Sequence, residues 1–271
     1  MLEFVILRAK KASEAALRQF YVTTLGLEEP YPLEFRPPGQ KESATLKFVL
    51  TGDGLDFDVD DSCNYWKIGL AIAHLDDFLK TRRIQGAPAP RQFRDVGYLT
   101  HVRDPEGYVV ELLQTTFEGR DGTQKGGHNR PRAIGQVTVR VADAEASLAF
   151  YRDRLGMKLL SVLPTPDFTL YFLAFTADTP PNADLVDNRE WLWQRPYTTV
   201  ELQHRHEPRK LHRSILVDGL KIGLSDADYD ALARVQGVGP NVTRMILKDP
   251  DGLHMLVMPH PSDDDDDDGL L

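Results

Sequence analysis

The stretch FYVTTLGL at residues 20–27 decides the fold, because it returns as FYRDRLGM at residues 150–157. A second motif follows each copy, DPEG at residues 104–107 and DPDG at residues 249–252. A repeat of this length is a duplicated domain and not the unit of a solenoid. The chain has 271 residues, of which 41% are hydrophobic, so it can fill two cores of about 100–150 residues each. The sequence therefore predicts two related domains in tandem.

Local patterns divide each copy into two modules of the same kind. In the second copy, residues 137–141 alternate apolar and polar side chains, which predicts a half-buried strand. Asp143 can cap the helix that follows, and Gly156 ends it. The further strands expected in this copy are residues 168–175, 198–202, 214–217, 245–247 and 253–258, with a second helix at 225–236.

The first copy follows the same order, which predicts an α+β fold of four βαβββ modules. Its expected elements are strands at residues 4–7, 45–50, 55–59, 68–72 and 109–113, with helices around Leu17 and Tyr21 and from about Asp76. The expected boundaries are an N-terminal domain at residues 1–117, a linker at 118–132, a C-terminal domain at 133–260 and a disordered acidic tail at 261–271.

Composition and charge exclude several classes of protein. The formal charge is −9, part of it from the aspartate run at residues 263–268, and this argues against nucleic-acid binding. Cys63 is the single cysteine, which excludes an intrachain disulfide and indicates a reducing compartment. No run approaches the roughly 20 apolar residues of a membrane span. We therefore expect a soluble, cytoplasmic protein that binds neither nucleic acid nor membranes.

The motifs and their order resemble the vicinal oxygen chelate superfamily, in which FYxxxLG follows the first helix and DPxG precedes the last strand. Both motifs occur twice, so the resemblance covers nearly the whole chain. The second copy is similar to glyoxalase I, the lactoylglutathione lyase, in QVTVR at residues 136–140, FTLYFLA at 168–174 and TVELQH at 199–204. The resemblance implies two tandem glyoxalase-like domains that form cups of curved sheet.

The resemblance also implies a divalent metal ion, with Zn²⁺ or Ni²⁺ best suited to the ligands, and a small-molecule substrate such as a glutathione hemithioacetal. Three family ligands fall on Gln136, Glu201 and His212, and Glu201 would also be the catalytic base. Leu256 stands where the family has a fourth ligand, a glutamate. The second copy thus offers three ligands and one apolar position.

Substrate positions of the family carry over in part. They fall on Arg140, which suits a glutathione carboxylate, and on Leu170 and Phe172, which suit an apolar group. From the residues alone, Glu201 is the strongest candidate, because it lies in an otherwise apolar strand. An unpaired carboxylate there would cost several kcal/mol, so Glu201 needs a partner.

The first copy carries a complementary set at the ligand positions. Phe4, either Asp56 or Asp58, and Lys67 occupy the first three, whereas Glu111 keeps the fourth. The first copy alone therefore makes a degenerate site.

Two pairings of the modules are open. If each domain closes its own cup, a three-ligand metal site forms in the second copy, and we favour this pairing. If modules pair across the domains, Gln136 and Glu201 face Glu111 and Lys67. The ammonium of Lys67 can then neutralise the carboxylates without a metal, and Glu111 becomes the alternative ligand and base.

Three functions remain after this comparison. The first is a glyoxalase I-like lyase or isomerase that forms an enediolate from a 2-oxo thiol adduct. The second is a catalytically degenerate protein that binds a small molecule or a protein partner without a cofactor. A remote third is an extradiol-type dioxygenase, although Gln136 and Leu256 break the 2-His-1-carboxylate set of such enzymes. Because fused domains can form within one chain the interface that single domains form by dimerising, we expect a monomer.

Overall fold

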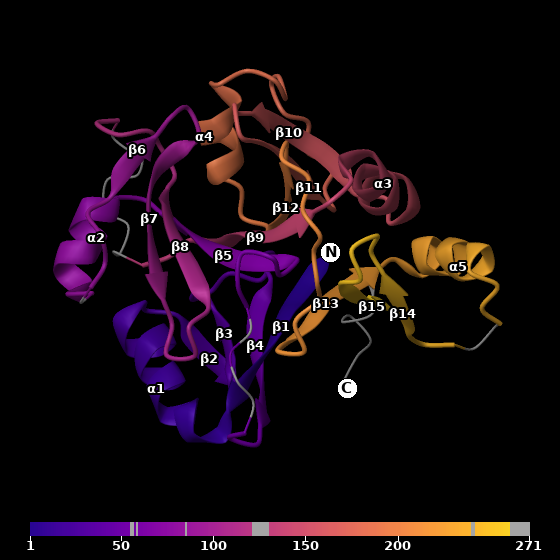
Figure 1. The fold of residues 1–271 in the computed structure, drawn as a ribbon, viewed down its shortest axis with the longest axis horizontal. Helices are drawn as coiled ribbons and strands as arrows, with labels where there is room; N and C mark the ends of the chain where they lie inside the picture. Colours follow the sequence, from indigo (N-terminus) through magenta and orange to yellow (C-terminus); the bar gives the residue numbers. More distant parts are fainter. Residues whose placement is uncertain (55–56, 58, 85, 121–129, 240–241, 261–271) are drawn as a thin grey trace, which may run out of the picture.

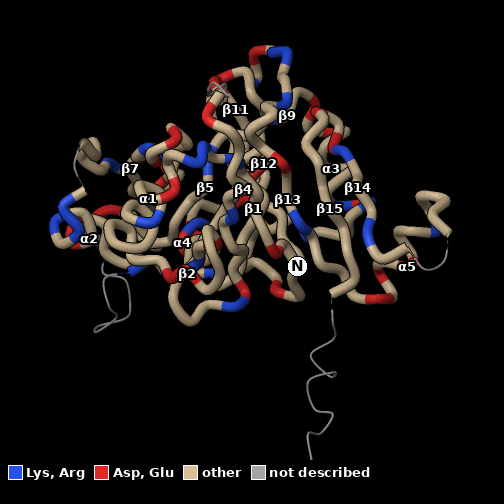
Figure 2. The backbone as a smooth tube through the Cα atoms, turned by 90° about the horizontal axis from the view of Figure 1, so that it is seen from below, with Lys and Arg blue, Asp and Glu red and all other residues tan. Residues whose placement is uncertain are grey.

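The computed structural model describes residues 1–260 except 55–56, 58, 85, 121–129 and 240–241. It has two curved sheets, which we call sheet I and sheet II, with short helices outside them (Figure 1). The expected acidic tail and the middle of the expected linker lie outside the described residues. Among the described residues, no helix has the length and apolar character needed to cross a bilayer. Lysine, arginine, aspartate and glutamate are interspersed along the elements in view in Figure 2.

Sheet I has seven strands in the order β14-β15-β13-β1-β4-β3-β2. They are β1 (Leu2–Lys10), β2 (Glu28–Tyr31), β3 (Glu34–Arg36), β4 (Thr45–Thr51), β13 (Val217–Leu224), β14 (Met245–Lys248) and β15 (His254–Pro259). Sheet II has eight strands in the order β10-β11-β12-β9-β5-β8-β7-β6. They are β5 (Tyr65–Ile72), β6 (Arg91–Phe93), β7 (Gly97–Arg103), β8 (Val109–Gln114), β9 (Ala133–Val141), β10 (Lys158–Pro164), β11 (Phe168–Ala174) and β12 (Thr199–Arg205).

The helical segments follow the first strand of each module, apart from one insertion, α4. They are η1 (Lys11–Ser13), α1 (Glu14–Arg18), η2 (Gln19–Thr24), α2 (Leu75–Arg82), α3 (Ala144–Leu148), η3 (Ala149–Arg154), α4 (Asn188–Trp193) and α5 (Asp226–Val235). The predicted α+β fold of glyoxalase-like modules is confirmed, although the fourth module has only two strands after its helix among the described residues.

Each sheet combines strands from both halves of the chain. In sheet I, β1 is antiparallel to β13, and in sheet II, β5 is antiparallel to β9. The expectation that each domain closes its own cup is therefore wrong. The physical reason is a continuous apolar face, because Val5 pairs with Leu220 and Leu7 with Val217, and all four side chains are buried. Both pairings use the same alternation of apolar residues, so the strand patterns alone could not distinguish them.

Within each half of the chain, a hydrogen bond joins the FYxxxLG motif to the DPxG motif. Tyr21 of the first FY pair donates its hydroxyl to Asp104 Oδ2 at 2.9 Å, and Tyr151 donates to Asp249 Oδ2 at 2.9 Å. The other oxygen of Asp104 accepts three backbone N–H groups from the turn that follows it. In each half, this hydrogen bond therefore links the two modules, although those modules belong to different sheets.

Two expected strands differ from the structure, and both differences move a site position. β13 begins only at Val217, because residues 214–216 form a turn in which Leu216 N–H donates to the Ser214 hydroxyl. Within residues 55–59, Phe57 and Val59 lie outside any strand, and the candidates Asp56 and Asp58 lie outside the described residues. The last strand of the first module is β4 instead.

Candidate active site

A cavity of about 460 Å³ opens on sheet II between the second and third modules. Its polar lining includes Lys67, His101, Glu111, Gln136 and Glu201. Its walls are mostly apolar and aromatic, with Trp66, Phe93, Phe168, Leu170, Phe172 and Trp193 among them. A few convergent polar groups in an apolar pocket are typical of a small-molecule site.

Strand register brings the polar residues together. Gln136 on β9 and Glu111 on β8 both pair with Gly69 of β5, which lies between them. A Cβ at Gly69 would lie 2.6 Å from Gln136 Cδ, so only glycine leaves room for the Gln136 side chain to cross β5. Glu201 on β12 pairs with Thr138, two residues beyond Gln136. The cross-half pairing of β5 with β9 thus builds the site.

The side chains form one connected network. The Lys67 ammonium contacts Glu111 Oε2 and lies 4.0 Å from Glu201 Oε2. Gln136 Nε2 donates to Glu111 Oε1 at 2.5 Å, and Thr138 Oγ1 donates to Glu201 Oε2 at 2.9 Å. Lys67, Glu111 and Glu201 are all at least 96% buried, so their mutual charges are little screened by water.

The environment moves the pKa values of the two carboxylates in opposite directions. Burial raises the pKa of Glu201, and the negative charge of Glu111 adds to this rise, while Lys67 opposes it. Burial also acts to raise the pKa of Glu111, but the adjacent Lys67 and His101 outweigh it and hold the pKa of Glu111 well below its usual range. Glu201 is therefore the better proton acceptor near neutral pH, whereas Glu111 is a fixed anion.

Two residues of this network were missed in the sequence. His101 Nε2 lies 2.9 Å from Glu111 Oε2, and its ring stacks on Trp66 with centroids 5.9 Å apart. Trp66 is the second missed residue, and Lys67 Nζ lies 4.4 Å from the centroid of its ring. A signal for His101 was present, because β7 and β8 form a hairpin around DPEG. Counting outward from that turn places His101 opposite Glu111, as the register has it.

The other predicted site residues fall in three places. Leu170 and Phe172 line the cavity, as the resemblance implied. Arg140 does not line it. Its buried guanidinium donates to the backbone carbonyls of residues 60, 63 and 65. His212 is exposed, bridges Cys63 and lies 3.2 Å from the Ser62 hydroxyl, so the structure does not bring it to Gln136 and Glu201.

The remaining ligand positions lie on sheet I. Leu256 lies there on β15, opposite Lys221 of β13. Phe4 pairs with Thr45 as Gln136 pairs with Thr199, and Ile6 pairs with Lys47 as Thr138 pairs with Glu201. Lys47 therefore holds the position that we had expected for Asp56 or Asp58.

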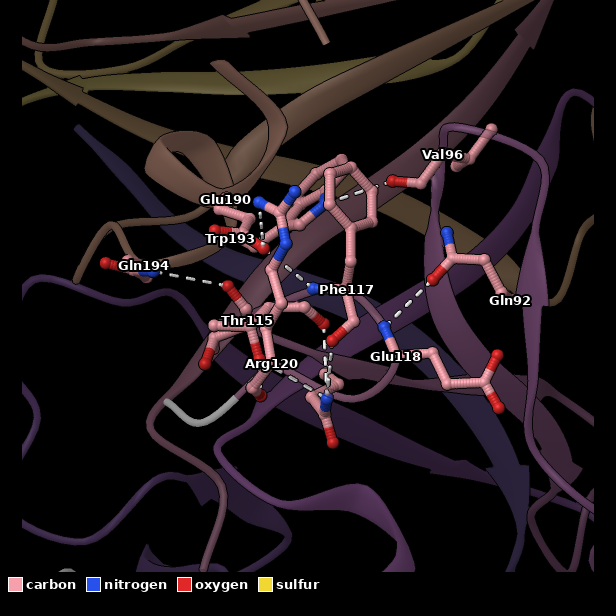
Figure 3. Close-up of polar contacts among 11 residues, drawn as sticks. Gln92, Val96, Thr115, Phe117, Glu118, Arg120, Glu190, Trp193 and Gln194 are labelled. Carbon is pink, nitrogen blue, oxygen red and sulfur yellow. Dashed lines mark hydrogen bonds and ion pairs between the residues drawn. The ribbon is translucent and has the colours of Figure 1, made fainter. Parts of the chain in front are cut away.

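Helix α4 of the third module contacts the second module (Figure 3), and its Trp193 forms part of the cavity wall. Glu190 accepts the backbone N–H of Phe117 at 2.9 Å, and the Trp193 indole donates to the carbonyl of Val96 at 3.1 Å. The Trp193 ring meets Phe172 edge to face at 5.1 Å. The wall therefore belongs to both modules.

Strand order, paired modules and the position of the cavity together define the class of fold: the chain has a glyoxalase-like fold, of the kind found in the vicinal oxygen chelate superfamily. The family model described as Glyoxalase/Bleomycin resistance protein/Dioxygenase superfamily matches residues 133–190. Glyoxalase I from Zea mays shares the fold with a TM-score of 0.66 at 16% identity, over 95% of this chain and 92% of the maize chain.

In sequence, the chain is similar to lactoylglutathione lyases. A probable chloroplastic lactoylglutathione lyase of Arabidopsis thaliana is 26% identical over 83% of this chain and 60% of its own length. A lactoylglutathione lyase of Oryza sativa subsp. japonica is 37% identical over 52% of this chain and 46% of its own length. The chain thus spans between 46% and 60% of the length of these curated relatives.

Proposed function

We propose that the cavity on sheet II catalyses a glyoxalase I-type isomerisation of a small 2-oxo thiol adduct, such as the hemithioacetal of glutathione. The similarity to lactoylglutathione lyases supports this reaction class. The single observation that carries the proposal is Glu201, a buried carboxylate in the lining of the cavity with a raised pKa and a cation 4.0 Å away. Such a group can accept a proton from carbon beside a carbonyl.

The residues present do not fit the divalent metal that the superfamily implies. The Lys67 ammonium stands at one of the four ligand positions and contacts Glu111, while Gln136 turns its amide nitrogen toward the same carboxylate. A cation beside this ammonium would meet a like charge. Among the described residues, no group of three or more His, Cys, Asp or Glu side chains is placed to hold a metal. The proposed reaction therefore proceeds without a metal.

The proposed mechanism uses this chain's own side chains. Glu201 removes the proton from the carbon that carries sulfur and hydroxyl. The electron pair of that C–H bond forms a carbon–carbon double bond, and the π pair of the neighbouring carbonyl moves to its oxygen, which gives an enediolate. The Lys67 ammonium has three N–H donors, of which Glu111 takes one, so it can stabilise the developing oxyanion. Glu201 then returns the proton to the adjacent carbon, and the hydroxyl proton passes to the new alcohol oxygen. The product is a 2-hydroxy thioester with the atoms of the substrate.

A direct assay tests the proposal. The purified protein is mixed with methylglyoxal and glutathione, and thioester formation is followed by its ultraviolet absorbance. We expect turnover that persists after dialysis against EDTA and is not increased by Zn²⁺ or Ni²⁺. No turnover with methylglyoxal or with larger 2-oxoaldehydes would reject the catalytic function, and loss of turnover in EDTA would reject the metal-free mechanism.

The pH dependence follows from the raised pKa of Glu201. The carboxylate must be ionised to act as a base, so turnover should rise with pH across a limb that lies above the ordinary glutamate value of about 4.3. Because a nearby cation favours ionisation of Glu201, we expect His101→Gln to move this rising limb to higher pH or leave it unchanged. The pH profile of kcat measures both.

Lys67→His tests whether the ammonium replaces the metal. The variant would place an imidazole with Glu111, Glu201 and Gln136, which is a ligand set suited to Zn²⁺ or Ni²⁺. We expect calorimetry to detect binding of one Zn²⁺ per chain in Lys67→His and none at this site in the wild type. Lys67→Gln is the matched control, because it removes the ammonium without adding an imidazole. Equal Zn²⁺ binding by the wild type and Lys67→His would contradict the replacement.

A second candidate function is binding of a small molecule without turnover. The closed network of Lys67, Glu111 and Gln136 favours it, because these groups satisfy one another without a substrate. In that case, S-substituted glutathiones or 2-oxo acids would raise the melting temperature in a thermal-shift assay, while the turnover assay stays blank.

A further inference from the structure

A second cavity, of about 610 Å³, lies on sheet I among strands β1, β4, β13, β14 and β15. It takes the place on sheet I that the active-site cavity takes on sheet II, because both lie on the paired strands of two modules. Nothing in the proposed reaction uses it. Its volume exceeds that of the active-site cavity, so it can accept a small molecule.

The second cavity reverses the chemistry of the first. Where sheet II presents carboxylates and an amide, sheet I presents a lysine and apolar groups. The corresponding positions are Phe4 for Gln136, Lys47 for Glu201, and Leu256 for Glu111. Because a cation and apolar side chains replace the carboxylates and the amide, we expect the site on sheet I to select an anion and not a neutral carbonyl compound.

Two ammonium groups lie near the ring of Phe4. Lys47 Nζ is 5.6 Å and Lys221 Nζ 5.2 Å from the ring centroid. Each lysine also pairs with a carboxylate, Lys47 with Glu34 at 2.8 Å and Lys221 with Glu3 at 2.7 Å. These contacts place both lysines beside the Phe4 ring in the lining of the cavity.

Arg213 leaves the cavity with an uncompensated positive charge. Three other cations line it, and each has a carboxylate partner, Arg8 pairing with Asp218 at 2.8 Å. In the part of the chain that the structure describes, Arg213 has no carboxylate within 4.0 Å, and its Nε is buried without a hydrogen-bond partner. Its Nη2 donates to the carbonyl of Val217 at 3.1 Å. Burial lowers the pKa of His254 in the same lining, and the charges of Arg213 and Lys248 add to this shift, while Asp218 opposes it.

Apolar groups occupy the rest of the lining. Ile6, Val49, Ile246 and Leu256 contribute to it, and Ile246 is 67% and Val49 37% exposed. An inorganic anion would leave this surface in water, whereas a ligand with an apolar body would cover it. Guanidinium and apolar wall together therefore select an organic anion.

We propose that the cavity on sheet I binds a small aromatic carboxylate, with the carboxylate at Arg213 and the ring against Phe4. The guanidinium offers paired N–H donors to a carboxylate, and Phe4 offers a π face to the ring. This site is independent of the proposed reaction. The failure of either proposal leaves the other intact, because the two sites share no lining residue.

Calorimetric titration with benzoate tests the proposal. We expect saturable binding of one benzoate per chain, weakened at least about tenfold by Arg213→Gln and by Phe4→Leu. Arg152→Gln is the matched control, because it removes an exposed arginine outside both cavities and should leave binding unchanged. Benzyl alcohol lacks the charge and inorganic phosphate lacks the ring, so each should bind at least about tenfold more weakly than benzoate.

Other outcomes would overturn the site. Benzoate binding that is lost in Glu201→Gln but kept in Arg213→Gln would place the ligand in the active-site cavity. Phosphate that binds as tightly as benzoate would show a simple anion site with no aromatic subsite. If Arg213→Gln does not fold, Phe4→Leu and the benzyl alcohol comparison still decide, and unchanged affinity in both rejects the proposal.

Discussion

Replacing Glu201 with glutamine is expected to lower kcat of the proposed isomerisation by about 10²- to 10⁴-fold, which is the usual contribution of a general base. Glutamine keeps the shape of the side chain and can still accept the hydrogen bond from Thr138, which reaches Glu201 Oε2 at 2.9 Å. It cannot accept a proton from carbon. Because the change removes a buried charge whose pKa is raised, the free energy of unfolding at pH 7 should stay equal or increase.

Glu111→Gln is the control that separates the two carboxylates. Glu111 contacts Lys67 and Gln136 and has a lowered pKa, so it is a poor base. Its loss should change KM and kcat through the position of Lys67, while the rising limb of the pH profile remains. That limb should disappear only in Glu201→Gln. Turnover of Glu201→Gln within tenfold of the wild type would assign the base to another residue.

Replacing Lys67 with methionine is expected to reduce the free energy of unfolding by about 3–5 kcal/mol, the usual cost of leaving a buried charge without its partner. Lys67 is 4% exposed and lies between Glu111 and Glu201, which are each 2% exposed. Without the ammonium, the folded-state pKa values of both carboxylates should rise above their unfolded values. The loss of unfolding free energy in Lys67→Met should therefore be smallest at low pH, where both carboxylates are protonated. It should grow as pH rises through their raised folded-state pKa values.

Lys221→Met is the matched control for this measurement. Lys221 is also a strand lysine paired with a glutamate, Glu3, but its side chain is 26% exposed and the pair is open to water. Removing such a pair usually costs about 0–1 kcal/mol. Urea unfolding of both variants between pH 5 and 8 gives the comparison. A deficit for Lys67→Met that equals that of Lys221→Met at every pH would mean that the network does not depend on the ammonium.

The modules could be predicted from local chemistry, whereas their pairing could not. Asp143 caps a helix as expected, with a side-chain oxygen that accepts the N–H group of Ala146, and Ser225 likewise accepts the N–H group of Asp228 at the start of the helix expected at residues 225–236. Such signals lie within a few residues of each other. The choice between β1–β13 and a pairing within each half depends on contacts between residues more than 200 positions apart, such as Val5 and Leu220. No local pattern records that choice.

The site residues divide in the same way, into those that local motifs predict and those whose place depends on how the halves pair. Gln136, Glu201, Glu111 and Lys67 could be singled out by their motif positions, and the structure brings these four together. His212 was assigned by counting from a strand that in fact begins at Val217, so its expected place on the strand was an error of boundary. Wherever a residue's place depended on which half supplied the neighbouring strand, the sequence left alternatives open.

The mutual pairing of the two halves also bears on how the chain is made. β1 lies between β4, which follows it closely, and β13, which emerges from the ribosome only after sheet II has been synthesised. At about 5–20 residues per second, one edge of β1 waits on the order of ten seconds for its partner. An unpaired strand edge is a template for pairing with other chains. We therefore expect the nascent chain to complete sheet II first and to rely on chaperones to shield β1 until translation ends.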